Sequence, residues 1–235
     1  MTPNSIRTQK LSILSGIAWG VLFFVALAMA GQFPPPNPMN TGAETLAVIQ
    51  SNILLAKASI PIGILAAGLS IPINALISGH IWRIESQEKG TMPLLTITAF
   101  GGGMGNIVFF FMVFLAWAGI FYRPDVAPEV VRVVHDTTWL LIVMAFSAPA
   151  LQMVCIALAG FQDKSAHPVF PRWYCYLMAW LAVGTSTGCA AIFFYSGPFA
   201  WTGVISFWIP ATAFGIWLVT LCVLFWRHAN RQATA

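Results

Sequence analysis

The stretch WYCYLMAWLAVGTSTGCAAIFFYSGPFAWTGVISFWIPATAFGIWLVTLCVLFW (Trp173–Trp226) decides the fold class of this chain. Its 54 residues include no Asp, Glu, Lys or Arg. A helix needs about 20 mostly apolar residues to cross about 30 Å of hydrocarbon, so the run is long enough for two crossings. The segment YSGPFAW (Tyr195–Trp201) divides it, because glycine and proline favour a turn. The stretch therefore predicts two membrane-spanning helices, about 173–194 and 203–226.

Four further uncharged runs are each long enough for one span. They are Leu11–Ala43, Ala58–Trp82, Gly90–Tyr122 and Thr137–Gln162, and we expect helices at about 11–30, 59–82, 92–121 and 136–160. With 58% hydrophobic residues and a mean hydropathy of +0.80, the composition excludes a soluble globular domain. We predict an all-α integral membrane protein, a six-transmembrane-helix bundle that forms a single polytopic domain over residues 1–235.

The distribution of positive charge predicts the orientation, since cytoplasmic loops carry an excess of Lys and Arg. An inside N-terminus leaves Lys57, Arg123 and Arg132 outside and puts eight positive residues inside: Arg7, Lys10, Arg83, Lys89, Lys164, Arg172, Arg227 and Arg231. We therefore expect both termini to be cytoplasmic and the chain to lie in the cell (inner) membrane. Ala28-Met29-Ala30 also fits a signal-peptide cleavage site, although the apolar stretch before it exceeds the usual core of about 7–15 residues.

Two outer segments differ from the spans in composition. The prolines of GQFPPPNPMN (Gly31–Asn40) predict a stiff connector. Apolar residues at helical spacing in the semi-polar segment that follows predict an outer surface helix at about 45–58.

The outer segment RPDVAPEVVRVVHDTTW (Arg123–Trp139) concentrates charge in an otherwise apolar chain. We expect Asp125 to cap a helix that begins at Val126. A helical repeat then places five residues on one stripe, namely Glu129, Arg132, Asp136, Trp139 and Val143, with His135 at its edge. The stripe fits a surface ion-pair network. It also fits the polar end of an outward-opening cavity lined by Trp139, Phe199 and Trp201, in which Asp136, with His135 and Arg132, acts as a general acid.

The middle of the membrane is predicted to hold no ionisable side chain. The central thirds of the six helices contain no Asp, Glu, Lys, Arg or His, which argues against proton coupling by a buried carboxylate. Amides occur there instead, and Asn74, Asn106 and Gln152 should point inward because an amide facing lipid is costly. These amides fit two roles. They could hold helices together through hydrogen bonds, with Gly101–Gly105 marking a close helix crossing, or they could line a polar cavity.

Several site chemistries are not expected. His80, His167 and His228 near the inner face and His135 near the outer one come from separate segments, so we predict no metal site and no cofactor. No C-x-x-C pattern occurs and all four cysteines fall in or at the ends of helices, so we expect no disulfide. A dispersed net charge of +4 gives no reason to expect nucleic-acid binding.

Three functional hypotheses remain from the sequence. The first is a protein that binds or passes a neutral or lipophilic small molecule through a polar-lined intramembrane cavity open to the outer face. The second is an integral-membrane enzyme that acts on a lipophilic, terpenoid- or sterol-like substrate with Asp136 as general acid. The third is an accessory subunit of a larger membrane complex. The expected partners are the lipid bilayer, a lipophilic small molecule, and a second copy or another membrane subunit.

Overall fold

The computed structural model describes residues 2–87, 92–123 and 125–234. Over these ranges the chain is helical and contains no strand. Six helical segments are long and apolar enough to cross a membrane, as predicted, so the chain is a multi-pass membrane protein. Lys89, one of the eight charges assigned to the inside, lies outside the described residues, as do Gly90 and Pro124.

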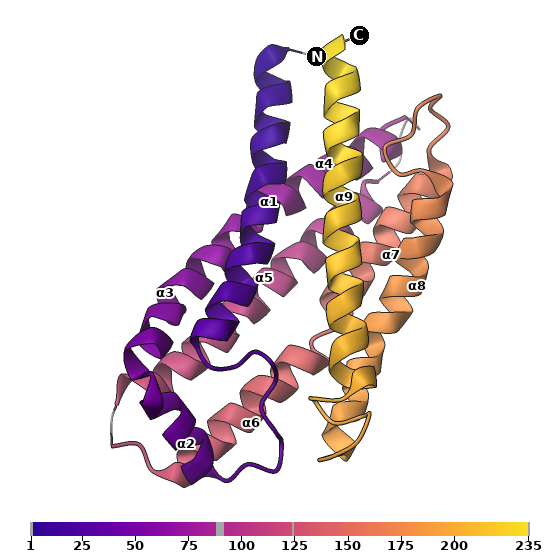
Figure 1. Cartoon of the computed structure of the whole chain (residues 1–235). Coiled ribbons are helices and arrows are strands. Elements are labelled where there is room, and N and C mark those ends of the chain that lie inside the picture. The colour runs from indigo at the N-terminus through magenta and orange to yellow at the C-terminus, as the bar shows by residue number, and fades with distance from the viewer. Residues whose placement is uncertain (1, 88–91, 124, 235) are drawn as a thin grey trace.

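The described residues form six spans and one short surface helix, arranged as in Figure 1. The first span is the single helix α1 (Pro3–Met29), and the third is α5 (Leu94–Tyr122). The second consists of α3 (Ile53–Leu69) and α4 (Ile71–Glu85), and the fourth of α6 (Pro128–Met144) and α7 (Ser147–Gln162). The fifth is α8 (Arg172–Ser186) continued by the 3-10 helix η1 (Thr187–Phe193). The sixth is the π-helix η2 (Val204–Trp208) followed by α9 (Ile209–Thr234).

The surface helix α2 (Gly42–Ser51) is shorter than expected. It begins with a capping box, in which the Glu44 N–H donates to Thr41 Oγ1 and the Thr41 N–H donates to the Glu44 carboxylate. It ends where Asn52 leaves the helical conformation. Residues 53–58, which we expected to belong to the surface helix, therefore begin the second span.

The start of α6 also differs from the prediction. α6 begins at Pro128 after Ala127, with no side-chain cap, so the expected cap by Asp125 is wrong. Proline suits this first position because it lacks the N–H that a cap would satisfy. The buried face of α6 carries Val131, His135, Trp139 and Val143, so His135 lies on that face and Asp136 lies on its flank.

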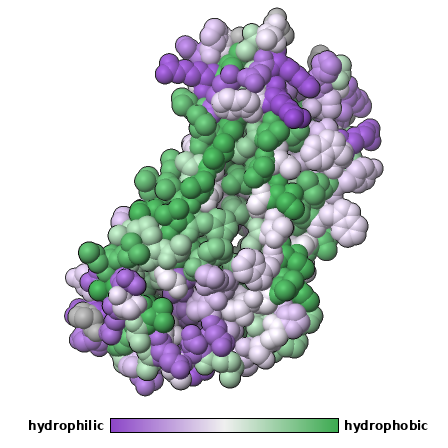
Figure 2. Space-filling model, in the orientation of Figure 1, coloured by the Kyte–Doolittle hydropathy of each residue, from purple (hydrophilic) through white to green (hydrophobic). Residues whose placement is uncertain are grey.

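The two termini lie side by side at one end of the bundle (Figure 1). Gln9 of α1 donates a hydrogen bond to Gln232 of α9 at 3.1 Å, which ties those ends together. Hydrophilic residues gather at both ends of the visible face, and a hydrophobic band lies between them (Figure 2), as expected of a membrane protein. The assignment of the end with the termini to the cytoplasm stays a prediction from charge.

α5 is central to the packing, since it contacts α3, α4, α6 and α7. Where α1 meets α5 and α9, the core is aromatic. The Trp19 ring lies edge-on against Phe110, Phe214 and Trp217, at centroid distances of 5.7, 5.2 and 6.1 Å. Such edge-to-face pairs stabilise by about 0.5–1.5 kcal/mol each beyond their buried area.

Candidate functional site

The second span is interrupted at Ser70, just before Pro72. Two further spans, the fourth and the sixth, also change helical form near a proline. Pro149 has no N–H, so the carbonyl of Ala145 has no donor four residues on. The Phe146 N–H donates to Met144 at 2.8 Å instead of to Ile142, and the chain breaks between α6 and α7. Pro210 likewise leaves the Ser206 carbonyl without its helical donor, at the junction of η2 and α9.

The interrupted segments of the fourth and sixth spans lie next to one another. η1 contacts α6, η2 and α9. Gly188 of η1 packs directly on the backbone carbonyl of Val143, where a side chain would collide with it. Thr187 Oγ1 donates to the Ile205 carbonyl of η2 at 2.7 Å. Irregular backbone at membrane depth is tolerated where it is buried in protein or lines a cavity.

A cavity of about 120 Å³ lies beside these interruptions. Its wall comes from α1, α5, α6, α7, α8, η2 and α9 and is mostly apolar, with seven phenylalanines: Phe23, Phe24, Phe109, Phe110, Phe146, Phe207 and Phe214. Ile142, Ala145 and Ser206, which lie at the two interruptions, also line it. The cavity therefore has an aromatic surface and lies beside the two breaks.

Three polar side chains line this aromatic cavity: Asn106, Thr185 and Ser206. Thr185 Oγ1 donates to the Ala182 carbonyl at 2.9 Å, and Ser206 Oγ donates to the Phe199 carbonyl at 2.7 Å. Both hydroxyl protons are thus already used. The Asn106 amide makes no side-chain hydrogen bond with any residue of the described ranges, so its donors and its acceptor are free.

One side of the aromatic cavity lies between α1 and α9. The two helices are in close contact towards the termini, where Gly20 packs against the Leu218 side chain. Further from the termini, Phe24 and Leu27 of α1 and Ala211 of α9 line the cavity instead. A small hollow lies in the hydrophobic band of the visible face (Figure 2). The Phe24 and Phe214 rings lie 6.4 Å apart on this side, so side chains of α1 and α9 form this wall of the cavity.

At the end of the bundle opposite the termini, which is the outer end if the charge-based prediction holds, the connector between α1 and α2 packs over the aromatic cavity. Phe33 of this connector packs against Phe24, Phe207 and Trp208, at centroid distances of 5.5, 6.5 and 6.2 Å. Next to it, buried Gln32 Oε1 accepts a hydrogen bond from Trp139 Nε1 at 2.9 Å and lies 3.0 Å from His135 Nε2. These contacts hold the connector against α6 and η2.

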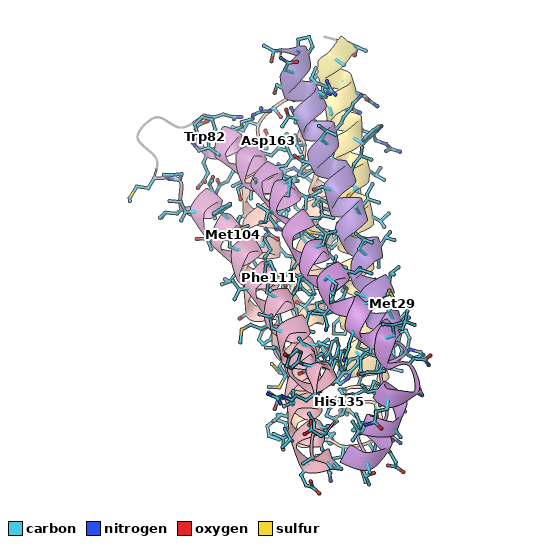
Figure 3. All side chains as sticks on the ribbon, turned by 90° about the vertical axis from the view of Figure 1, so that its left-hand side faces the viewer. Met29, Trp82, Met104, Phe111, His135 and Asp163 are labelled. Atoms are coloured by element: carbon cyan, nitrogen blue, oxygen red, sulfur yellow. The ribbon has the colours of Figure 1, made fainter. Side chains whose placement is uncertain are left out.

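The proposed acid group lies at this outer end but outside the aromatic cavity. His135 is at the same end as Met29 and far from Trp82 and Asp163 (Figure 3). Asp136 Oδ2 is 3.9 Å from Arg132 Nε, and Asp136 Oδ1 is 3.8 Å from His135 Nδ1. The three side chains do come together, but none of them lines the cavity. The catalytic role of Asp136 stays a prediction.

The six residues predicted to bind a ligand occupy three different environments. Asn106 lines the cavity. Asn74 and Gln152 are buried and bonded to each other, since Gln152 Nε2 donates to Asn74 Oδ1 at 2.7 Å. The remaining three, Trp139, Phe199 and Trp201, belong to the outer end, where Trp139 binds Gln32, Trp201 Nε1 donates to the Pro36 carbonyl at 2.9 Å, and Phe199 stacks on Phe194.

Sequence reasoning missed two groups of residues. The first group comprises Gln32 and the phenylalanines of the cavity. Pro149 and Pro210, which lie within long apolar runs and also line the cavity, could have indicated where the helices break beside it. The second is Glu85, which is buried and accepts hydrogen bonds from the Leu95 and Thr96 N–H groups at 2.9 and 2.8 Å. Glu85 thus caps α5, a position where a carboxylate is favoured.

The histidines and cysteines suggest no metal centre in the described part of the chain. Within residues 2–87, 92–123 and 125–234, no three His, Cys, Asp or Glu side chains come close enough to hold a metal ion. His80 packs on Phe225 with ring centroids 4.8 Å apart and lies 5.3 Å from His228. The four cysteines are free.

Comparison of the chain with protein-family models, with curated proteins and with solved structures finds no match. The class of the protein is therefore defined by its own fold, a multi-pass membrane protein with six spans. Its distinguishing feature is the aromatic cavity at the interrupted helices.

Proposed function

We propose that this protein binds a neutral lipophilic small molecule in the aromatic cavity and receives it from the bilayer between α1 and α9. The observation that carries the proposal is the Asn106 amide, which lines an aromatic cavity without a partner in the described ranges. An amide in an apolar environment is costly unless it is hydrogen-bonded. A ligand with one hydroxyl or carbonyl group would provide that bond.

The size of the cavity supports a ligand that is only partly enclosed. An apolar cavity of about 150 Å³ is large enough to bind benzene, and this one measures about 120 Å³. Because it is smaller than that, it suits one branched isoprenoid unit, with the remainder of the molecule between α1 and α9. The lining contains no charged side chain, which favours a neutral ligand.

The contacts around the cavity favour a site that binds the ligand over a path that lets it pass through the membrane. They also favour entry of the ligand from the bilayer over entry from the outer face. At the end opposite the termini, Phe33 of the connector packs on the lining residues Phe24 and Phe207. In the middle of the membrane, Asn74 and Gln152 are bonded to each other next to Gly103, where no space for a further side chain exists. These observations favour a blind cavity reached from the bilayer instead of a polar path open to the outer face.

The test is native mass spectrometry of the protein purified in a mild detergent, with the variants Asn106→Leu and Asp136→Asn. We expect one bound neutral lipophile in the wild-type protein. Loss of a buried hydrogen bond costs about 1–3 kcal/mol, so Asn106→Leu should raise the Kd for the lipophile by about fivefold or more and lower its occupancy at a fixed concentration. Asp136→Asn should leave it unchanged, because Asp136 does not line the cavity.

Other outcomes would favour the other hypotheses. A variant Asp136→Asn that binds the lipophile but accumulates it chemically unchanged, where the wild type yields a product, would support the enzyme. An empty cavity together with a stoichiometric second chain would support the accessory subunit. Phospholipid adducts alone, equal in wild type and Asn106→Leu, would contradict the binding proposal.

A further inference from the structure

A second cavity, separate from the aromatic one, lies at the end of the bundle that carries the termini. It measures about 270 Å³ and lies between the α7–α8 connector and the last turns of α9. Its polar lining is entirely basic, with His167 from the connector and Arg227, His228 and Arg231 from α9. Trp173 and Leu224 form part of its apolar wall.

The basic groups of this second cavity are available to a ligand. Neither Arg227 nor Arg231 forms an ion pair with a residue of the described ranges, and both are exposed. Asp163 belongs to the same connector but does not line the cavity, and its Oδ1 accepts a hydrogen bond from the Ser165 N–H at 2.9 Å. Asp163 is close enough to act electrostatically on His228, but it forms no ion pair with either guanidinium group within the described ranges.

The hydrogen bonds of His228 leave one donor free. Gln9 Nε2 donates to Gln232 Oε1 at 3.1 Å, which turns Gln232 Nε2 towards His228 Nε2 at 2.6 Å. Because an amide nitrogen can only donate, His228 Nε2 must accept, and the proton of the neutral ring is then on Nδ1. The second cavity thus offers guanidinium and imidazole donors and no side-chain carboxylate acceptor.

We propose that this second cavity binds the phosphate group of an anionic phospholipid. Arginine donors match phosphate oxygens in geometry and in charge. Trp173 and Leu224 give the cavity an apolar wall for the part of the lipid below the headgroup. Exposed Trp173 and Trp226, with Lys10 5.2 Å from the Trp226 ring, indicate the interfacial level at which headgroups lie. This proposal does not rest on the function proposed for the aromatic cavity.

The test titrates the full-length protein in detergent with phosphatidylglycerol and with phosphatidylcholine of the same acyl chains, followed by native mass spectrometry. The variant is Arg227→Gln/Arg231→Gln. The control is Arg7→Gln/Lys164→Gln, which removes two exposed positive charges from the same end of the bundle but none from the cavity. Thermal unfolding verifies that both variants are folded.

The wild type should bind phosphatidylglycerol about tenfold or more tightly than phosphatidylcholine. Both lipids carry the phosphate, but the choline cation of phosphatidylcholine offsets its charge and is repelled by the guanidinium groups. The cavity variant should lose this preference and the control should retain it. Equal binding of the two lipids, or equal losses in both variants, would overturn the proposal. Displacement of phosphatidylglycerol by equimolar inorganic phosphate would also overturn it, because the ligand would then be a soluble phosphate.

Discussion

Gln152 Nε2 donates a 2.7 Å hydrogen bond to Asn74 Oδ1, which joins α7 to α4 across the glycine run of α5. Gln152 Nε2 also lies 3.1 Å from the carbonyl of Ala99, and Asn74 Nδ2 donates to the Ser70 carbonyl at 2.8 Å. Gly103 packs directly against both amides. The polar residues here hold helices together, which small residues and hydrogen bonds do in membranes without help from the hydrophobic effect.

This packing predicts opposite effects for two glycines of the same helix. A Cβ at Gly103 would collide with the Asn74 and Gln152 amides, whereas Gly101 faces open space. Gly103→Ala should destabilise the protein by about 1–3 kcal/mol through overpacking. Gly101→Ala should be neutral or slightly stabilising, since alanine is the better helix former. Thermal unfolding in detergent measures both, and equal shifts for the two variants would contradict the close crossing.

The outer connector provides a second prediction. Gln32 Oε1 is the acceptor for Trp139 Nε1, so Gln32→Leu leaves a buried donor unsatisfied, at a cost of about 1–3 kcal/mol. Trp139→Phe removes the same bond from the other side. The double variant should lose less stability than the sum of the two single variants, with a coupling of about 0.5–3 kcal/mol. Strict additivity in unfolding measurements would show that the bond contributes nothing.

The number of spans could be predicted because hydrocarbon imposes a minimum length on any apolar helix. Trp173–Trp226 could be divided correctly without knowing what its helices contact. The Gln32–Trp139 bond could not be predicted, since its partners are separated by 107 positions and lie in segments that look like an ordinary connector and an ordinary helix. Such pairings depend on how the spans pack.

The site could be predicted only in part, for a related reason. Asn74, Asn106 and Gln152 are alike in the sequence, as amides within apolar runs. Two of them lie on neighbouring helices at a height where they bond to each other, and the third lines a cavity. The prolines Pro149 and Pro210 indicate where helices break, but only the packing of η1 against α6 and η2 brings the breaks together.

The orientation of the bundle is a third prediction. Both termini lie at one end (Figure 1), and the excess of Lys and Arg assigns that end to the cytoplasm. In a cysteine-free background, Met39→Cys should react with a membrane-impermeant maleimide in intact cells. Ser165→Cys should react only after lysis. Both positions are exposed in the structure. The reverse labelling pattern would show that the termini lie outside and would contradict the predicted orientation.

The central claim, a lipophile site in the aromatic cavity, is tested most directly by photolabelling with an isoprenoid alcohol that carries a diazirine. The variant Ala211→Phe fills the cavity, and the control Val219→Phe adds a ring on the exposed side of the same helix. The wild type and Val219→Phe should be labelled on α1 and α9 peptides that contain Phe24 and Phe214. Labelling of those peptides should fall about tenfold in Ala211→Phe, since overpacking of about 1–3 kcal/mol opposes the ligand. Labelling that spreads evenly over lipid-facing peptides, and that Ala211→Phe leaves unchanged, would contradict the claim.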